Sequence, residues 1–135
     1  TDTTMKYFTI AELTRSATAQ AKGIDNAPGQ GHIDNLRALV DNVLDPLREA
    51  WGKPITVNSG YRCPALNRAV GGATASQHLL GQAADITAGS AADNRRLMQL
   101  CLDMGLPFDQ LIDESGFTWL HVSYGPRQRR QVLKL

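Results

Sequence analysis

Hydrophobic residues recur at helical spacing in two long segments of the chain. In residues 33–51 the apolar positions fall three or four apart with charged residues between them, which predicts a long helix. Pro46 lies inside this segment and is expected to kink or locally perturb the helix, because proline has no backbone N–H to donate. A second helix is expected from Ser90, a good N-cap residue with Asp93 at the capping-box position, to about Met104.

Short runs of β-branched or alternating apolar residues predict four strands, at residues 55–58, 83–87, 110–114 and 118–124. In the second run, alternation turns Asp85 to the face opposite Ala84 and Ile86. The last two runs lie close together in the chain and are expected to pair as an antiparallel hairpin.

Two shorter helices are expected, one at residues 9–15, where Thr9 can cap the N-terminus, and one at residues 64–70. Residues 17–31 are rich in small and turn-forming residues and are expected to be irregular. No repeat, low-complexity segment or linker divides the chain. The pattern therefore predicts an α+β fold in one domain, residues 1–135.

Composition narrows the classes of function. The chain has 135 residues, 42% hydrophobic and 20% charged, so it is large enough to bury a core, and we expect a monomer. A net charge of +1 gives no steering toward nucleic acid or membranes. No run is long enough to insert into a bilayer and no signal peptide is evident, which favours synthesis in the cytoplasm. Cys63 and Cys101 are expected to be reduced thiols, with one disulfide as the alternative if the protein is secreted.

Two histidines and one aspartate offer a metal-binding chemistry. His78 and Asp85 lie in residues 76–86, and His121 lies in the last predicted strand. Two neutral imidazoles and a carboxylate suit zinc, and three protein ligands leave one coordination position open, as in catalytic rather than structural sites. Taken singly, each residue is more simply explained as an ordinary loop or strand residue. The pattern as a whole favours a zinc site.

This pattern resembles that of a known family. His78, Gly81, Ala84 and Asp85, followed by an aromatic-Leu-His-Val-Ser-Tyr strand, resemble the M15 class of zinc peptidases, which includes D-Ala-D-Ala carboxypeptidases and phage endolysins. Ser59-Gly-Tyr-Arg62 and residues 8–26 also resemble segments of the compact single-domain branch, so the resemblance covers nearly the whole chain. It implies a Hedgehog/DD-peptidase-like fold, in which a small antiparallel sheet with flanking helices holds Zn²⁺ in a cleft.

The resemblance also implies a catalytic carboxylate. Residues 108–114 resemble the corresponding strand of the Hedgehog signalling domain, and the hairpin is expected to bring Glu114 near His121. Glu114 would then pass a proton from a zinc-bound water to the leaving amine. Several family members have an acidic residue three places before the last histidine, where this chain has Thr118, which cannot act as a base. Asp113 is the fallback, although alternation turns it away from the face that Glu114 occupies.

Arg62 is the second residue to which the resemblance assigns a catalytic role. The family's arginine in this segment engages substrate or helps polarise the scissile carbonyl, and a guanidinium offers planar donors for either task. The alternative is a structural ion pair that holds the loop. Four residues near the end of the chain form a basic tail, which is expected to be a solvated terminus: Arg127, Arg129, Arg130 and Lys134.

The function expected from these residues is a zinc metallopeptidase that cleaves bacterial peptidoglycan stem peptides by attack of a zinc-bound water. It would act at the cell wall as a D-Ala-D-Ala carboxypeptidase or an endolysin-type endopeptidase, with a phage or prophage gene as one expected source. Because Thr118 departs from the family pattern, a zinc-stabilised module that binds wall peptides or proteins without cutting them is the alternative. A Hedgehog-like protein-interaction domain is a third possibility.

Overall fold

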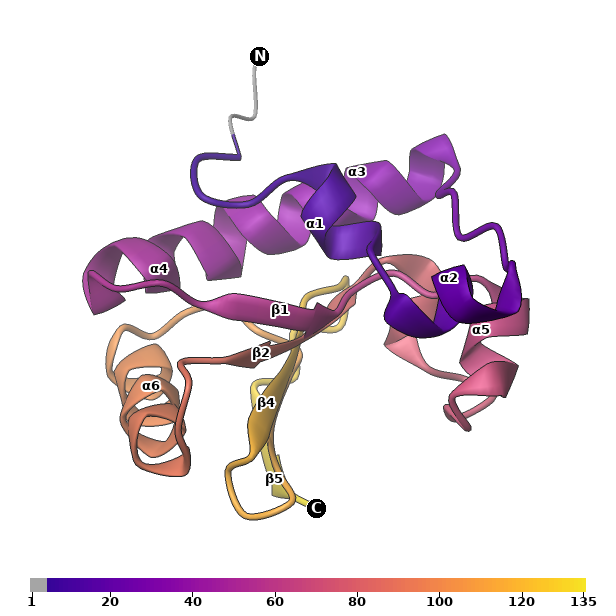
Figure 1. Cartoon of the computed structure of the whole chain (residues 1–135). Coiled ribbons are helices and arrows are strands. Elements are labelled where there is room, and N and C mark those ends of the chain that lie inside the picture. The colour runs from indigo at the N-terminus through magenta and orange to yellow at the C-terminus, as the bar shows by residue number, and fades with distance from the viewer. Residues whose placement is uncertain (1–4) are drawn as a thin grey trace.

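The computed structural model describes residues 5–135 and has an α+β architecture, as predicted (Figure 1). Five strands form one sheet in the order β1-β2-β4-β3-β5. The strands are β1 (Thr56–Ser59), β2 (Ala83–Thr87), β3 (Gln110–Glu114), β4 (Trp119–Ser123) and β5 (Gln131–Lys134). The helices are α1 (Ile10–Thr14), α2 (Ala17–Lys22), α3 (Gln30–Leu39), the π-helical turn η1 (Val40–Leu44), α4 (Asp45–Trp51), α5 (Pro64–Ala69), the 3₁₀ helix η2 (Gln77–Leu80) and α6 (Ala91–Asp103). No helix within this part of the chain is long and apolar enough to cross a membrane.

The sheet is mixed, and the expectation of an antiparallel sheet is therefore wrong at one edge. Strands β1 to β4 pair antiparallel, but β5 pairs parallel to β3. The chain reverses direction after β4, so β5 runs opposite to β4 and in the same direction as β3. It then pairs with the free edge of β3, which makes this pair parallel. Residues 131–134 are mostly exposed and carry no strong apolar alternation, which is why their sequence pattern does not predict a strand.

The predicted long helix forms, with an interruption next to Pro46. Helices α3 and α4 are joined by η1, in which the N–H of Asp45 donates to the carbonyl of Val40. A wider turn before the proline is the local adjustment expected where proline cannot donate to the preceding turn. The helix begins at Gln30, three residues earlier than predicted.

Residues 17–31 were expected to be irregular, and this prediction is wrong for residues 17–22 and 30–31, whereas residues 23–29 form no helix or strand. Helix α2 forms because Ser16 caps it, its side chain accepting from the N–H of Ala19. Gly23 ends the helix in the left-handed region with φ of 65°. These two end signals outweigh the turn-forming composition between them.

The two faces of the sheet have different roles. Alternate residues of β2 and β4, Ala84, Ile86, Leu120 and Val122, are fully buried in a core shared with the α3 to α4 helix and α6. Figure 1 shows α6 on one side of β2 and β4, and α2 and α5 on the other side. The positions between the buried residues face the second side, which leaves polar side chains of β2 and β4 available for a site.

Gly60, just after β1, is expected to be the backbone position least tolerant of a side chain. An added Cβ would overlap the carbonyl oxygen of Leu13 in α1, whereas nothing lies within 4 Å of a Cβ added at Gly31 in α3. We expect Gly60→Ala to lower the free energy of unfolding by about 2 kcal/mol or more, because backbone cannot move aside as a side-chain end can. Gly31→Ala is the matched control and should be neutral or stabilising in the same urea titration. Equal stability of the two variants would contradict the close approach of α1 and β1.

Candidate metal centre and its cleft

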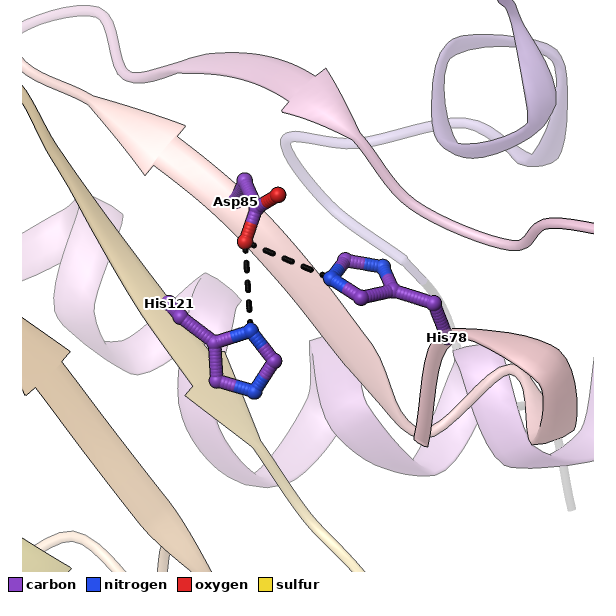
Figure 2. A group of neighbouring side chains, drawn as sticks. All are labelled: His78, Asp85 and His121. Carbon is purple, nitrogen blue, oxygen red and sulfur yellow. Dashed lines mark hydrogen bonds and ion pairs between the residues drawn. The ribbon is translucent and has the colours of Figure 1, made fainter. Parts of the chain in front are cut away.

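Asp85 and His121 face each other across two strands. They are paired directly in the antiparallel register of β2 and β4, with their side chains on the face away from the core. The Nδ1 atom of His121 lies 3.2 Å from Oδ1 of Asp85 (Figure 2). The predicted orientation of Asp85, opposite Ala84 and Ile86, is confirmed by this register and by the burial of its two neighbours.

The helix η2 brings the second histidine to this pair. The side chain of Ser76 caps η2 by accepting from the N–H of His78 at 3.1 Å. Gly81 ends η2 with φ of +74°, and a Cβ there would lie 2.6 Å from the carbonyl oxygen of His32. Glycine is therefore required for the chain to turn from His78 into β2.

The tautomer of His78 follows from its surroundings. Its Nδ1 lies 2.7 Å from the carbonyl oxygen of Gly60, which can only accept, so Nδ1 carries the proton and donates. The lone pair of Nε2 then points toward Oδ1 of Asp85, 3.3 Å away. This Nε2 is buried and has no hydrogen-bond partner among residues 5–135. A histidine that binds a metal through one ring nitrogen usually donates from the other to a carbonyl or carboxylate oxygen, which fixes the orientation of the ring.

The three residues therefore fit a metal ion. One nitrogen of each histidine and a carboxylate oxygen lie within 4.8 Å of one another. Burial raises the pKa of Asp85, but the neighbouring imidazoles of His121 and His78 outweigh this effect and hold the pKa well below its usual range. Two imidazole nitrogens and an ionised carboxylate that converge on one point are a donor set that a divalent cation satisfies.

A cleft of about 690 Å³ opens over these residues. Its floor continues along β3, because Ile112 is paired with His121 and lies on the same face. Glu114, two residues further on, also lines the cleft and is paired with Trp119, which lines it too. Glu114 is thus two residue pairs along the ladder from His121 and on the same face, which agrees with the predicted hairpin.

Asp113, the fallback for the catalytic carboxylate, lies outside the cleft. So does Thr118, which stands where several family members have an acidic residue. Asp113 is buried and accepts a hydrogen bond from the N–H of Phe117, so it stabilises the turn between β3 and β4. The hydroxyl of Thr118 donates to the carbonyl of Ser115 in the same turn. Neither residue lines the cleft, and Glu114 is the acidic residue of this hairpin that does.

Arg62 lies at the edge of the cleft, beyond β1. The backbone N–H of Arg62 donates to the backbone carbonyl of His78, which ties this loop to the metal centre. Its Nε is buried and has no hydrogen-bond partner in the described part of the chain. Burial lowers the pKa of Arg62, and the charges of Asp85 and Glu114 oppose this shift. The guanidinium is therefore desolvated beside two carboxylates, with donor capacity that its neighbours do not fully use.

The four residues of the basic tail are exposed, as expected, but the segment is held by β5 and by an ion pair that the sequence did not predict. Arg129 donates to both carboxylate oxygens of Asp109, from Nε at 2.6 Å and from Nη2 at 3.0 Å. Gln77, the residue before His78, donates to the same carboxylate at 3.0 Å. Arg127 and Arg129 both line the cleft. In the sequence, this network would be visible only as opposite charges at Asp109 and Arg129, twenty residues apart. Such pairs of charges are too common to predict a contact.

Asp109 should make the stability of the domain depend on pH in the acid range. Its hydrogen bond with Arg129 lowers the pKa of Asp109 to about 2. A lowered pKa favours the folded state above the unfolded value of about 3.9, and this contribution is lost as the pH falls toward 2. We expect Asp109→Asn to be less stable than the wild type at pH 7, with the difference shrinking below about pH 4 in thermal melts. Asp103→Asn, at the exposed end of α6, is the control, and the same pH dependence in that variant would contradict the assignment.

Comparisons with known proteins show the family of the chain. The family described as Peptidase M15 matches residues 6–123. A zinc D-Ala-D-Ala carboxypeptidase of Streptomyces albus G is 43% identical over 91 residues, which cover 66% of this chain and 34% of the relative. The family match spans most of the chain and includes the cleft residues of β2, β3 and β4. The chain belongs to the Peptidase M15 family.

Proposed function

We propose that the protein is a zinc-dependent metallopeptidase that hydrolyses peptide bonds in peptidoglycan stem peptides of the bacterial cell wall. The observation that carries the proposal is the buried Nε2 of His78, which lacks a hydrogen-bond partner and faces Asp85 and His121 at the base of an open cleft. A structural zinc site would be closed by a fourth protein ligand, whereas His78, Asp85 and His121 leave an open position for chemistry.

A bound zinc ion would supply Lewis acidity: it would polarise an amide carbonyl and lower the pKa of a water molecule enough for that water to act as a nucleophile at neutral pH. His78 and His121 contribute neutral nitrogen ligands, and the hydrogen bond from His78 to Gly60 fixes the ring in the required tautomer. Asp85 supplies the single negative charge of the ligand set. A bound Zn²⁺ would keep one positive charge after Asp85 is counted, and this charge would stabilise the negative oxygen that develops on the substrate.

Glu114 is the proposed proton carrier. It lines the cleft on the same face as His121, so a carboxylate oxygen can accept the proton of the attacking water. The same oxygen can then donate that proton to the nitrogen of the leaving amine. Thr118 cannot take this role, because it is bound within the turn.

Arg62 is the proposed substrate-positioning residue. Its guanidinium lies in the cleft with an unsatisfied buried Nε, and it is near enough to Asp85 and Glu114 for their charges to act on its pKa. A planar donor at this place can hold a carbonyl or carboxylate oxygen of the substrate beside the metal centre. Gly72 leaves room for it, since a Cβ there would lie 3.0 Å from Nη1 of Arg62.

The substrate class rests on the similarity to the Streptomyces albus G carboxypeptidase. This chain spans about a third of that protein, so its bond preference is open to experiment. The cleft adjoins a second hollow between α2 and β1, and the two share Arg62, Val70 and Asp85. A peptide can therefore continue past the metal centre toward α2, which suits a substrate longer than a dipeptide.

Metal binding should depend on His78 and His121 and not on the third histidine of the chain. We expect one zinc per wild-type chain, and loss of it in His78→Ala and His121→Ala, as measured by metal analysis after gel filtration. His32→Ala, which alters a histidine stacked on Tyr61, should retain the ion. Zinc at about one hundred times Kd should stabilise the wild type by about 2.7 kcal/mol. Full zinc content in His78→Ala would disprove the ligand set.

Turnover should depend on Glu114. We expect the zinc-loaded wild type to release peptide fragments from purified peptidoglycan, identified by mass spectrometry, and chelation to stop the release. Glu114→Gln should lower kcat by about 10²- to 10⁴-fold while zinc content and melting temperature stay unchanged. Glu12→Gln, at a half-buried position of α1 outside the cleft, should remain fully active. Intact peptidoglycan from several wall types with the wild type would instead favour a zinc-stabilised module that binds wall peptides without cutting them.

A further inference from the structure

We propose that Arg127 binds a carboxylate of the substrate on the side of the metal centre away from Arg62, and so selects peptides that carry an acidic group beyond the scissile bond. This inference rests on the proposed function, because it assigns a binding position to the substrate of the same cleft. The structure supports it by position, by rigidity and by charge.

The order of the strands sets the position. Arg62 follows β1, the ligands Asp85 and His121 lie on β2 and β4, and Arg127 precedes β5 at the opposite edge of the sheet. Both arginines line the cleft. Arg127 lies beside Asp109, the residue before β3, and β3 is the strand next to β4 on the side away from β2, about 5 Å from it.

The backbone around Arg127 is held in place. The N–H of Gln128 donates to the carbonyl of Gly125, which closes a turn with a proline at its second position and Arg127 at its third. Two residues further on, the N–H of Arg129 donates to Oδ1 of Asp109. The base of the Arg127 side chain is therefore fixed at the wall of the cleft, while its end remains exposed.

Among the described residues, Arg127 makes only a long ion pair, to a carboxylate that it shares with Arg129. Asp109 is fully buried and already accepts from Arg129 and Gln77, and Nη2 of Arg127 lies 3.9 Å from it with a side chain that is 63% exposed. Arg129 is less suited to this purpose, because its Nε and Nη2 already donate to Asp109.

The balance of charges within the cleft also favours an anion. Arg129 is paired with Asp109, which leaves Arg62 and Arg127 in the lining beside Glu114 and the proposed metal ligand Asp85. A bound Zn²⁺ would outweigh the charge of Asp85, so the cleft would be positive. A guanidinium with free donors binds a carboxylate through two parallel hydrogen bonds, which gives direction as well as charge. Wall stem peptides offer two such groups, a carboxylate within the chain and one at its C-terminus. The shared chemistry is a peptide carboxylate.

The test compares a stem peptide with two variants of it, one amidated at the internal carboxylate and one amidated at the C-terminus. For the zinc-loaded wild type, we expect kcat/KM to be on the order of tenfold higher for the free peptide than for one of the two amidated variants. The difference should lie in KM rather than in kcat. Arg127→Gln should lose this preference with little change in kcat for the amidated peptide. Arg96→Gln removes the same charge from the exposed surface of α6 and should keep the preference. The position at which amidation matters identifies the carboxylate.

Calorimetry with zinc-loaded Glu114→Gln, alone and combined with Arg127→Gln, measures the same preference as binding. Absence of hydrolysis by the wild type would overturn the proposed function, and the calorimetric preference would still decide the role of Arg127. Equal affinity for free and amidated peptides, or a preference that persists after Arg127→Gln, would disprove the anionic position. A purely structural role of Arg127 would lower the melting temperature and leave the preference unchanged.

Discussion

The register of β2 against β4 is the constraint on which the candidate site depends. Asp85 and His121 are paired because Ala84 and Ile86 on one strand, and Leu120 and Val122 on the other, all face the core. A slip of one residue would turn the polar side chains into the core and the apolar ones into the cleft. The same burial that stabilises the sheet therefore also places two of the three proposed ligands within reach of one ion.

The structure concentrates unsatisfied polar groups around the cleft. Seven buried side-chain atoms in residues 5–135 lack a hydrogen-bond partner, and four of them belong to residues that line the cleft: Arg62, Gln77, His78 and Trp119. A buried polar group without a partner costs about 1–3 kcal/mol, so these positions lower the stability of the empty domain. A metal ion and a peptide can satisfy such groups. The uneven distribution is typical of a site built for binding rather than for stability.

Sequence patterns predicted what depends on local periodicity. Strands β1 to β4, the break beside Pro46 and the outward direction of Asp85 all follow from spacing, and the family match confirms the resemblance carried by His78, Asp85 and His121. Contacts between distant segments were not predictable. The carbonyl of Gly60 that orients His78 is backbone, which every residue has, and the pairing of Arg129 with Asp109 depends on how β5 returns to the sheet. The roles of Glu114 and Arg62 remain predictions.

The strand order also bears on when the metal centre can form during folding. Asp85 and His121 are 36 residues apart in the chain, and they meet only after the hairpin of β3 and β4 has docked on β2 through its second strand. Closing such a separation is slow compared with forming local helices and hairpins. Zinc can therefore stabilise the finished domain but cannot guide its early steps. A newly made chain must complete most of its sheet before it can hold the ion.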